Sequence, residues 1–140
     1  MGKRLHVHKK HVIEYAGIEA FNYTYNDFQC LLETLGCSTT PDSLDYPDSF
    51  EVGEKEYERA LNALKTIKEH PELTEITIEP LNENESEIRL DVSKDIMDDV
   101  DGCYGDQKTP REKLVQLIKD MQDFYNAADK ADGYLHFDAF

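Results

Sequence analysis

The chain has 140 residues and carries 30 Asp and Glu against 15 Lys and Arg, which gives a formal net charge of −15. This length is typical of one domain, so we expect residues 1–140 to form a single globular domain. The negative charge disfavours direct binding to nucleic acid or to an anionic membrane surface, because both repel a polyanionic protein.

The first half of the chain predicts one strand and two helices. Residues 5–16 alternate between apolar and polar side chains, which is typical of a half-exposed strand. Asn26 is a candidate N-cap for a short helix that ends at Gly36. Residues 37–53 are rich in Ser, Thr, Pro and Asp and predict a loop. Residues 54–69 predict a second helix, because one apolar stripe runs along them and their charges complement the helix dipole.

A β-hairpin and a brief helical turn are expected next. Residues 76–80 and 88–92 both alternate and are joined by a polar turn, which is the pattern of a hairpin. Ser93 is a candidate cap for a helical turn that Gly102 closes.

The strongest local signal opens the last predicted helix. Thr109, Pro110 and Glu112 form a capping box with proline in the first helical position. The helix is followed by residues 134–140, whose alternation predicts a final strand. We therefore expect an α+β two-layer sandwich, with about four mostly antiparallel strands, helices on one face and a ferredoxin-like or related strand order.

Histidines near the amino terminus raise the question of a metal site. On a strand, His6 and His8 lie on one face about 6.6 Å apart, and His11 lies on the other face. A zinc site needs at least one further protein ligand. His136 can supply one only if the first and last strands are neighbours. The small number of ligands favours an ordinary solvated strand face, so no metal ion or cofactor is expected.

The segment 132–137 follows a long amphipathic helix and resembles the middle of an EF-hand calcium loop, with Gly133 at the sharp turn. The resemblance implies calcium ligands at the first, third and twelfth loop positions. These positions hold Ala128, Lys130 and Ala139. A second partial match surrounds Gly102. We expect ordinary glycine turns, and a divalent-metal-responsive domain built on these two degenerate loops is the alternative.

No complete catalytic motif is present. The sequence has neither a glycine-rich phosphate loop nor a nucleophile elbow, so we expect binding rather than catalysis, with an enzyme of unrecognised site as the other alternative. Cys30 on a predicted helix is expected to be a small buried hydrophobe, and Cys37 in the predicted loop is the candidate exposed thiol. The odd number of cysteines and the lack of an apolar signal core favour the cytoplasm.

The acidic residues gather in three groups, which predict a carboxylate-rich surface that binds a basic protein partner. In the first group a carboxylate recurs at every third residue, and the other two surround the predicted hairpin and the helical turn after it. The second group consists of Glu79, Glu83, Glu85 and Glu87. The candidate partner-binding residues, from the first and third groups, are Asp42, Asp45, Asp48, Glu51, Asp98, Asp99 and Asp101.

Overall fold

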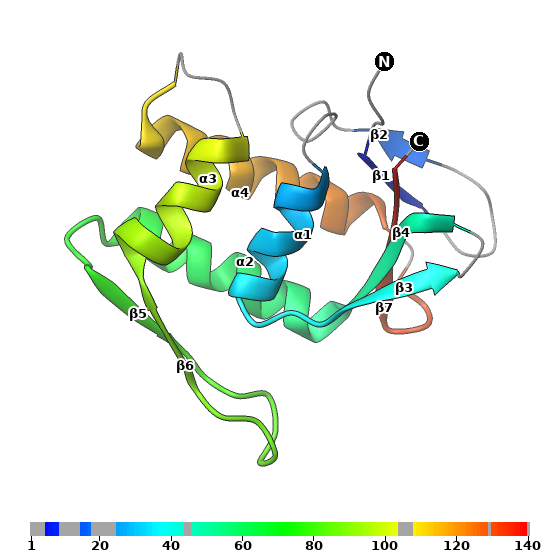
Figure 1. The fold of residues 1–140 in the computed structure, drawn as a ribbon, viewed down its shortest axis with the longest axis horizontal. Coiled ribbons are helices and arrows are strands. Elements are labelled where there is room, and N and C mark those ends of the chain that lie inside the picture. The colour runs from blue at the N-terminus through cyan, green and yellow to red at the C-terminus, as the bar shows by residue number, and fades with distance from the viewer. Residues whose placement is uncertain are drawn as a thin grey trace.

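The main sheet contains five antiparallel strands in the order β2-β1-β7-β4-β3 (Figure 1). The computed structural model describes residues 5–8, 15–17, 25–43, 46–103, 108–128 and 130–139. The strands are β1 (Leu5–His8), β2 (Tyr15–Gly17), β3 (Thr39–Ser43), β4 (Tyr46–Gly53) and β7 (Tyr134–Ala139). The last strand, β7, therefore lies at the centre, between β1 and β4.

Three helices pack around one aromatic side chain of β7. They are α1 (Tyr25–Thr34), α2 (Glu54–Glu69) and α4 (Pro110–Ala127). The ring of Phe137 lies 5.4 Å from Phe28 of α1, 6.1 Å from Tyr57 of α2 and 5.4 Å from Phe124 of α4. All four side chains have no solvent exposure. The core is thus built where the three helices meet one face of the central strand.

Local signals explain where these helices begin and end. The apolar stripe predicted for residues 54–69 is the set that α2 buries, namely Tyr57, Ala60, Leu61, Leu64 and Ile67. The capping box of Thr109 and Glu112 is formed at the start of α4. Gly36 follows α1 with φ +91°, the left-handed region that glycine enters without strain. These predictions are confirmed. Helix α1 begins at Tyr25, so Asn26 lies inside the helix and the choice of Asn26 as its N-cap was wrong.

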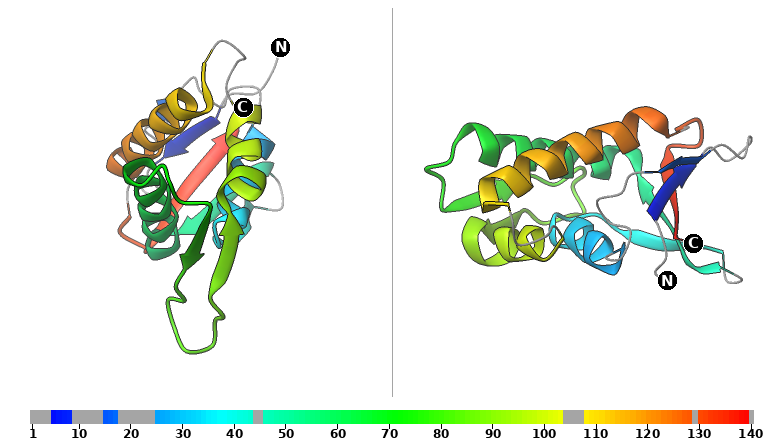
Figure 2. Two further views of the ribbon diagram at one scale, coloured as in Figure 1. Left: turned by 90° about the vertical axis from the view of Figure 1, so that its left-hand side faces the viewer. Right: turned by 90° about the horizontal axis from the view of Figure 1, so that it is seen from above.

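A second sheet projects from the helices as a β-hairpin (Figure 2). Its strands are β5 (Glu75–Ile78) and β6 (Ile88–Asp91), which pair with each other in antiparallel register. The π-helical turn η2 (Val92–Met97) and α3 (Asp98–Cys103) follow. The hairpin prediction is confirmed. The cap of the turn is Asp91, which accepts from the amide N–H of Lys94, so the choice of Ser93 was wrong.

The mixed α+β class is confirmed, and the ferredoxin-like strand order is not. Two local predictions were wrong. The single strand expected over residues 5–16 is replaced by β1 and the start of β2, which pair with each other in antiparallel register. Most of residues 37–53 belongs to the strands of the β3–β4 hairpin instead of a loop. Its alternation is clear only near Phe50 and Val52, because two prolines interrupt the pattern.

Candidate functional site

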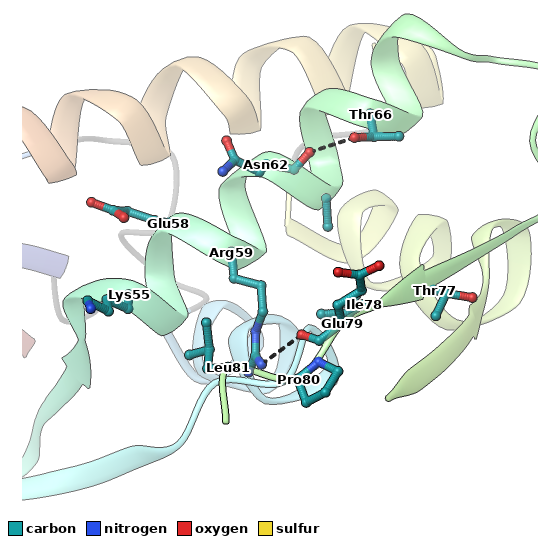
Figure 3. Close-up of a pocket in the computed structure, with 11 residues that line it drawn as sticks. Lys55, Glu58, Arg59, Asn62, Thr66, Thr77, Ile78, Glu79, Pro80 and Leu81 are labelled. Carbon is teal, nitrogen blue, oxygen red and sulfur yellow. Dashed lines mark hydrogen bonds between the residues drawn. The ribbon is translucent and has the colours of Figure 1, made fainter. Parts of the chain in front are cut away.

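A groove of about 610 Å³ separates α2 from β5 and the segment that follows it (Figure 3). One wall consists of α2 side chains from Lys55 to Thr66, and the other consists of residues 77–81. Lys55 and Thr66 are eleven residues apart, which corresponds to about 16 Å of helix rise. An extended chain of about five residues spans that length, since each residue advances about 3.3 Å.

The backbone of β5 presents hydrogen-bonding groups at this groove. Val92 donates its amide N–H to the carbonyl of Thr74 (3.0 Å), so these opposed residues form a hydrogen-bonded pair. Such pairs alternate along an antiparallel ladder, which makes Thr77 and Arg89 a non-hydrogen-bonded pair. The N–H and C=O of Thr77 therefore point away from β6. Among the described strands β5 pairs only with β6, so this edge of β5 is open.

Arg59 fastens the hairpin to the helices from the floor of the groove. Its Nη1 donates to the carbonyl of Glu79 (3.2 Å) and to the carboxylate of Glu85 (3.0 Å), and its Nη2 donates to the carbonyl of Gly36 (2.7 Å). The side chain is only 11% exposed. A Cβ added to Gly36 would lie 2.7 Å from Cδ1 of Ile88. The glycine thus permits the close approach of α1, Arg59 and the hairpin.

The carboxylate of Glu85 holds the tip of the hairpin in place. It accepts from the amide N–H of Leu81 (3.1 Å) as well as from Arg59. These two donors favour the ionised form, so the pKa of Glu85 lies below its ordinary value, with the backbone N–H as the larger cause. Leu81 itself is 43% exposed, which leaves a large apolar side chain open to solvent at the end of the groove.

Another carboxylate of the groove, Glu58, is held from the side of α4. The hydroxyl of Tyr125 donates to Glu58 and lies 3.1 Å from Oε1 of Glu54. Hydrogen bonding to the Glu58 carboxylate is the main reason that the pKa of Tyr125 is raised above its ordinary range. Lys130 places its ammonium 4.3 Å from the centre of the Tyr125 ring. The hydrogen bond from Tyr125 therefore fixes the position of the Glu58 carboxylate at the edge of the groove.

Negative charge is concentrated on the hairpin, residues 75–91, which we call the acidic arm. These residues include six Asp and Glu and one basic residue, Arg89. Glu79, Glu83 and Glu87 are exposed. The negative charge continues into η2 and α3 through Asp95, Asp98 and Asp99. The groove itself is lined by Glu58 and Glu79 together with Lys55 and Arg59, and the surplus of carboxylates lies on the rest of the arm and on η2 and α3.

The candidate partner-binding residues fall on two separate parts of the fold. Asp42 lies in β3, and Asp48 and Glu51 lie in β4. Asp98, Asp99 and Asp101 lie in α3, and Asp45 is outside the described residues. Helix α1 lies between α3 and the β3–β4 hairpin and contacts both (Figure 1).

Two of these carboxylates have partners within the protein. Glu51 is beside His136, with 3.6 Å between Oε2 and Nδ1. Asp99 accepts from the hydroxyl of Thr34 (3.3 Å). Asp98 is exposed. The open edge of β5 was not predicted, because alternation locates a strand and does not show which of its edges remains unpaired.

The histidine of the last strand is the second polar feature of the fold. Strands β1 and β7 are neighbours, and His8 is directly opposite His136 in their register. His136 has no solvent exposure, and its Nε2 lies 2.8 Å from Oδ2 of Asp132. The condition under which His136 can join the amino-terminal histidines is therefore met.

The two glycine turns differ. Gly133 has φ +82° and makes the turn between α4 and β7, as expected. Nζ of Lys130, at the third position of the loop that resembles an EF-hand, donates to the carbonyls of Tyr125 and Ala128. Gly102 lies within α3. In the loop around Gly133, the ammonium of Lys130 therefore occupies a position where a calcium loop places an oxygen ligand.

The environments of the two cysteines whose side chains are described are the reverse of those predicted. Cys30 is exposed and Cys37 is buried, so both predictions were wrong. Burial raises the pKa of Cys37 to about 12, with a smaller contribution from Glu56, whose carbonyl accepts from Sγ (3.4 Å). Cys30 is two positions from Phe28 and so lies on the opposite side of α1. The exposure of Cys30 could therefore have been predicted from the helical periodicity of α1.

Neither a metal-binding cluster nor a membrane-spanning helix is found among the described residues. Within that part of the chain, no three His, Cys, Asp or Glu side chains converge on a point where they could hold a metal ion. None of the helices described has the length and apolar character that crossing a bilayer requires. Comparison of the chain with protein-family models, curated proteins and solved structures gives no match.

Proposed function

We propose that the protein is a non-catalytic cytoplasmic binding module that docks an extended, basic segment of a partner protein. The observation that carries the proposal is the open edge of β5, which faces a groove and lies on the acidic arm. The partner segment lies between β5 and α2 as an added strand. Direct nucleic-acid binding and membrane binding are not part of this function.

In strand addition, the backbone and the side chains of the bound segment have different roles. Main-chain hydrogen bonds to the sheet edge supply affinity, and contacts with alternate side chains supply specificity. The backbone N–H and C=O of Thr77 are available for this purpose at the middle of the groove. Leu81 and Pro80 offer an apolar contact at one end.

Charge accounts for the basic character of the partner. Glu79, Glu83 and Glu87 are exposed along the arm, so they attract Lys and Arg of an approaching chain. Arg59 does not oppose this attraction, because Glu85 neutralises it within the groove floor. Attraction between exposed charges is screened by salt, with a Debye length of about 10 Å at 0.1 M. Binding is therefore expected to weaken as ionic strength rises.

The acidic residues of the β3–β4 hairpin are not needed for this mode of binding. Asp42 and Asp48 lie in the main sheet, away from the groove, and Glu51 is beside His136. Asp98 and Asp99 begin α3 after the arm and extend its negative charge. We therefore assign partner binding to the arm and to the start of α3.

The test compares two proline variants at opposed positions of one hairpin. Thr77→Pro removes the N–H on the β5 edge that faces the groove, and Arg89→Pro removes the equivalent N–H on the far edge of β6. Neither N–H belongs to the ladder, so both substitutions leave the β5–β6 hydrogen bonds in place. Circular dichroism checks that both variants are folded.

The measurement is affinity capture from lysate at low and high salt, with quantification of each retained protein. We expect a retained protein that binds the wild type and Arg89→Pro, is lost with Thr77→Pro and is released by salt. Retention that is equal for Thr77→Pro and the wild type would contradict docking on β5. Retention that is insensitive to salt would contradict the role of the acidic arm.

A further inference from the structure

A second cavity, of about 430 Å³, lies where β4 ends and α2 begins. We call it the Tyr134 pocket, after the aromatic residue of β7 that lines it. The side chain of Tyr134 is 43% exposed. Tyrosine is enriched at interfaces, because its ring offers a large area for contact and its hydroxyl remains in water. The exposed ring is therefore a candidate contact for a ligand.

Two glycines leave the space beside this ring open. Gly53 is directly opposite Tyr134 in the register of β4 and β7. Glu54 donates its amide N–H to the carbonyl of Gly133 (2.9 Å), so the adjacent pair of Gly53 and Tyr134 is a non-hydrogen-bonded pair, with Cα atoms about 4.5 Å apart. A Cβ added to Gly133 would meet no atom within 4 Å. Neither glycine places a side chain between the ring and the pocket.

A carboxylate is fixed close to the ring. A Cβ added to Gly53 would lie 3.7 Å from Oε2 of Glu56, so this carboxylate lies over the residue that is opposite Tyr134. The amide N–H of Ser38 donates to the same oxygen (2.8 Å) and holds the carboxylate in place. An ionised carboxylate has about four acceptor sites, and the bond from Ser38 uses one of them.

The ring and the carboxylate together favour arginine as the group that binds here. A guanidinium stacks on an aromatic face and donates to a carboxylate through a planar fork of N–H groups, which an ammonium cannot form. Two carboxylates, Glu54 and Glu56, and one ammonium, Lys55, line the pocket. The protein already contains a cation–π contact, since Nζ of Lys130 is 4.3 Å from the centre of the Tyr125 ring.

The Tyr134 pocket adjoins the groove between α2 and β5. Lys55, in the first turn of α2, lines both cavities (Figure 3). Arg59 on the floor of the groove donates to the carbonyl of Gly36, and Ser38, two residues later, lines the pocket. Two residues of extended chain span at most about 7 Å. A segment that is docked on β5 therefore reaches the pocket through a linker of about two residues.

We propose that the partner segment carries an arginine beyond its strand and that this arginine binds in the Tyr134 pocket. The guanidinium stacks on the ring of Tyr134 and donates to the carboxylate of Glu56. This inference rests on the proposed docking at β5 and adds a contact that distinguishes arginine from other basic residues. The partner is thus defined by an extended basic strand with an arginine about two residues from one of its ends.

Extended peptides test the proposal by isothermal titration calorimetry with the full chain. The core is a strand of alternating Lys and Val, and two Gly join it to a terminal Arg, at the amino end in one peptide and at the carboxyl end in another. Matched peptides replace Arg by citrulline, which keeps the shape and removes the charge. We expect one Arg peptide to bind about two- to fivefold more tightly than its citrulline counterpart, the factor that an exposed cation–π contact supplies.

Protein variants locate this preference for Arg over citrulline. Tyr134→Ala should abolish it, Tyr134→Phe should keep it, and Glu56→Gln should reduce it, because these changes remove the ring, keep the ring and remove the charge. Val115→Ala is the matched control and should keep it, since Val115 of α4 is 42% exposed and lines neither the groove nor the Tyr134 pocket. Circular dichroism checks that each variant is folded.

The outcomes separate this inference from the proposed function. If the core peptide binds but Arg and citrulline peptides have equal affinities, the inference is wrong and docking on β5 stands. A preference for Arg that survives in Tyr134→Ala, or that is lost equally in Val115→Ala, would also overturn the inference. If no peptide binds, docking on β5 is wrong, and the inference fails with it.

Discussion

Replacement of Arg59 by methionine tests whether this side chain couples the acidic arm to the helices. Methionine keeps an unbranched apolar stem and lacks the guanidinium, so the substitution removes the charge and the donors while retaining the packing of the stem. Three acceptors lose the hydrogen bond from Arg59, namely the carbonyls of Gly36 and Glu79 and the carboxylate of Glu85, which keeps its bond from the amide N–H of Leu81.

The expected loss follows from how these acceptors meet water. A hydrogen bond that involves a charged group contributes about 1.5–3 kcal/mol, and less where water can replace the lost partner. Glu79 is exposed and Glu85 is partly exposed, so water rehydrates both, whereas the Gly36 carbonyl receives the shortest bond, 2.7 Å. We therefore expect Arg59→Met to lower the free energy of unfolding by about 2–4 kcal/mol.

Urea unfolding followed by far-UV circular dichroism measures this loss. Arg89→Met is the control, because Arg89 pairs with Glu87 at the surface, where the two side chains have exposed fractions of 70% and 51%. Exposed pairs of this kind contribute about 0.2–1 kcal/mol at most. Amide exchange of Leu81 should also accelerate in Arg59→Met. If the two variants lose the same stability, Arg59 does not fasten the arm.

Three further predictions concern cysteine reactivity, glycine conformation and pH. A thiol reagent at mildly alkaline pH should label Cys30 and spare Cys37, whose raised pKa and burial suppress the thiolate; peptide mapping by mass spectrometry would contradict this by finding Cys37 labelled first. Gly36→Ala should be more destabilising than Gly133→Ala, because both have positive φ but only Gly36 also meets Ile88; equal unfolding midpoints would refute the clash. The pKa of Glu85 is lowered in the folded state, so its ionised carboxylate contributes stability at pH values above the pKa of the unfolded chain, near 4.5, and this stability is lost as the pH falls. The wild type should therefore be more stable than Glu85→Gln at neutral pH, and the difference should shrink on acidification. Urea unfolding at two pH values measures this difference.

Elements with complete local signals could be predicted from the sequence. The capping box of Thr109 and Glu112 marks the start of α4, and the apolar stripe from Tyr57 to Ile67 identifies the buried face of α2. Each of these signals depends only on residues within about four positions of one another, the range over which helix side chains interact. Tertiary contacts reinforce them without changing them.

Elements defined by distant partners could not be predicted. The β3–β4 hairpin is stable because β7 pairs with β4, and β7 comes from the other end of the chain. The role of Arg59 depends on Gly36 and on the tip of the arm, which are 23 and 26 residues away. The pairing of His8 with His136 joins strands 128 positions apart. No local pattern encodes such contacts, so the candidate sites became visible only in the fold.

The central claim is that an extended basic chain adds to the open edge of β5. The most direct measurement is an NMR titration of the ¹⁵N-labelled protein with a peptide of alternating Lys and Val, and with its Glu and Val counterpart. We predict that the basic peptide shifts the amide signals of Thr77 and Leu81 and slows amide exchange at Thr77, and that salt and Thr77→Pro abolish these effects. Shifts confined to the β3–β4 hairpin, or equal shifts with the acidic peptide, would contradict the claim.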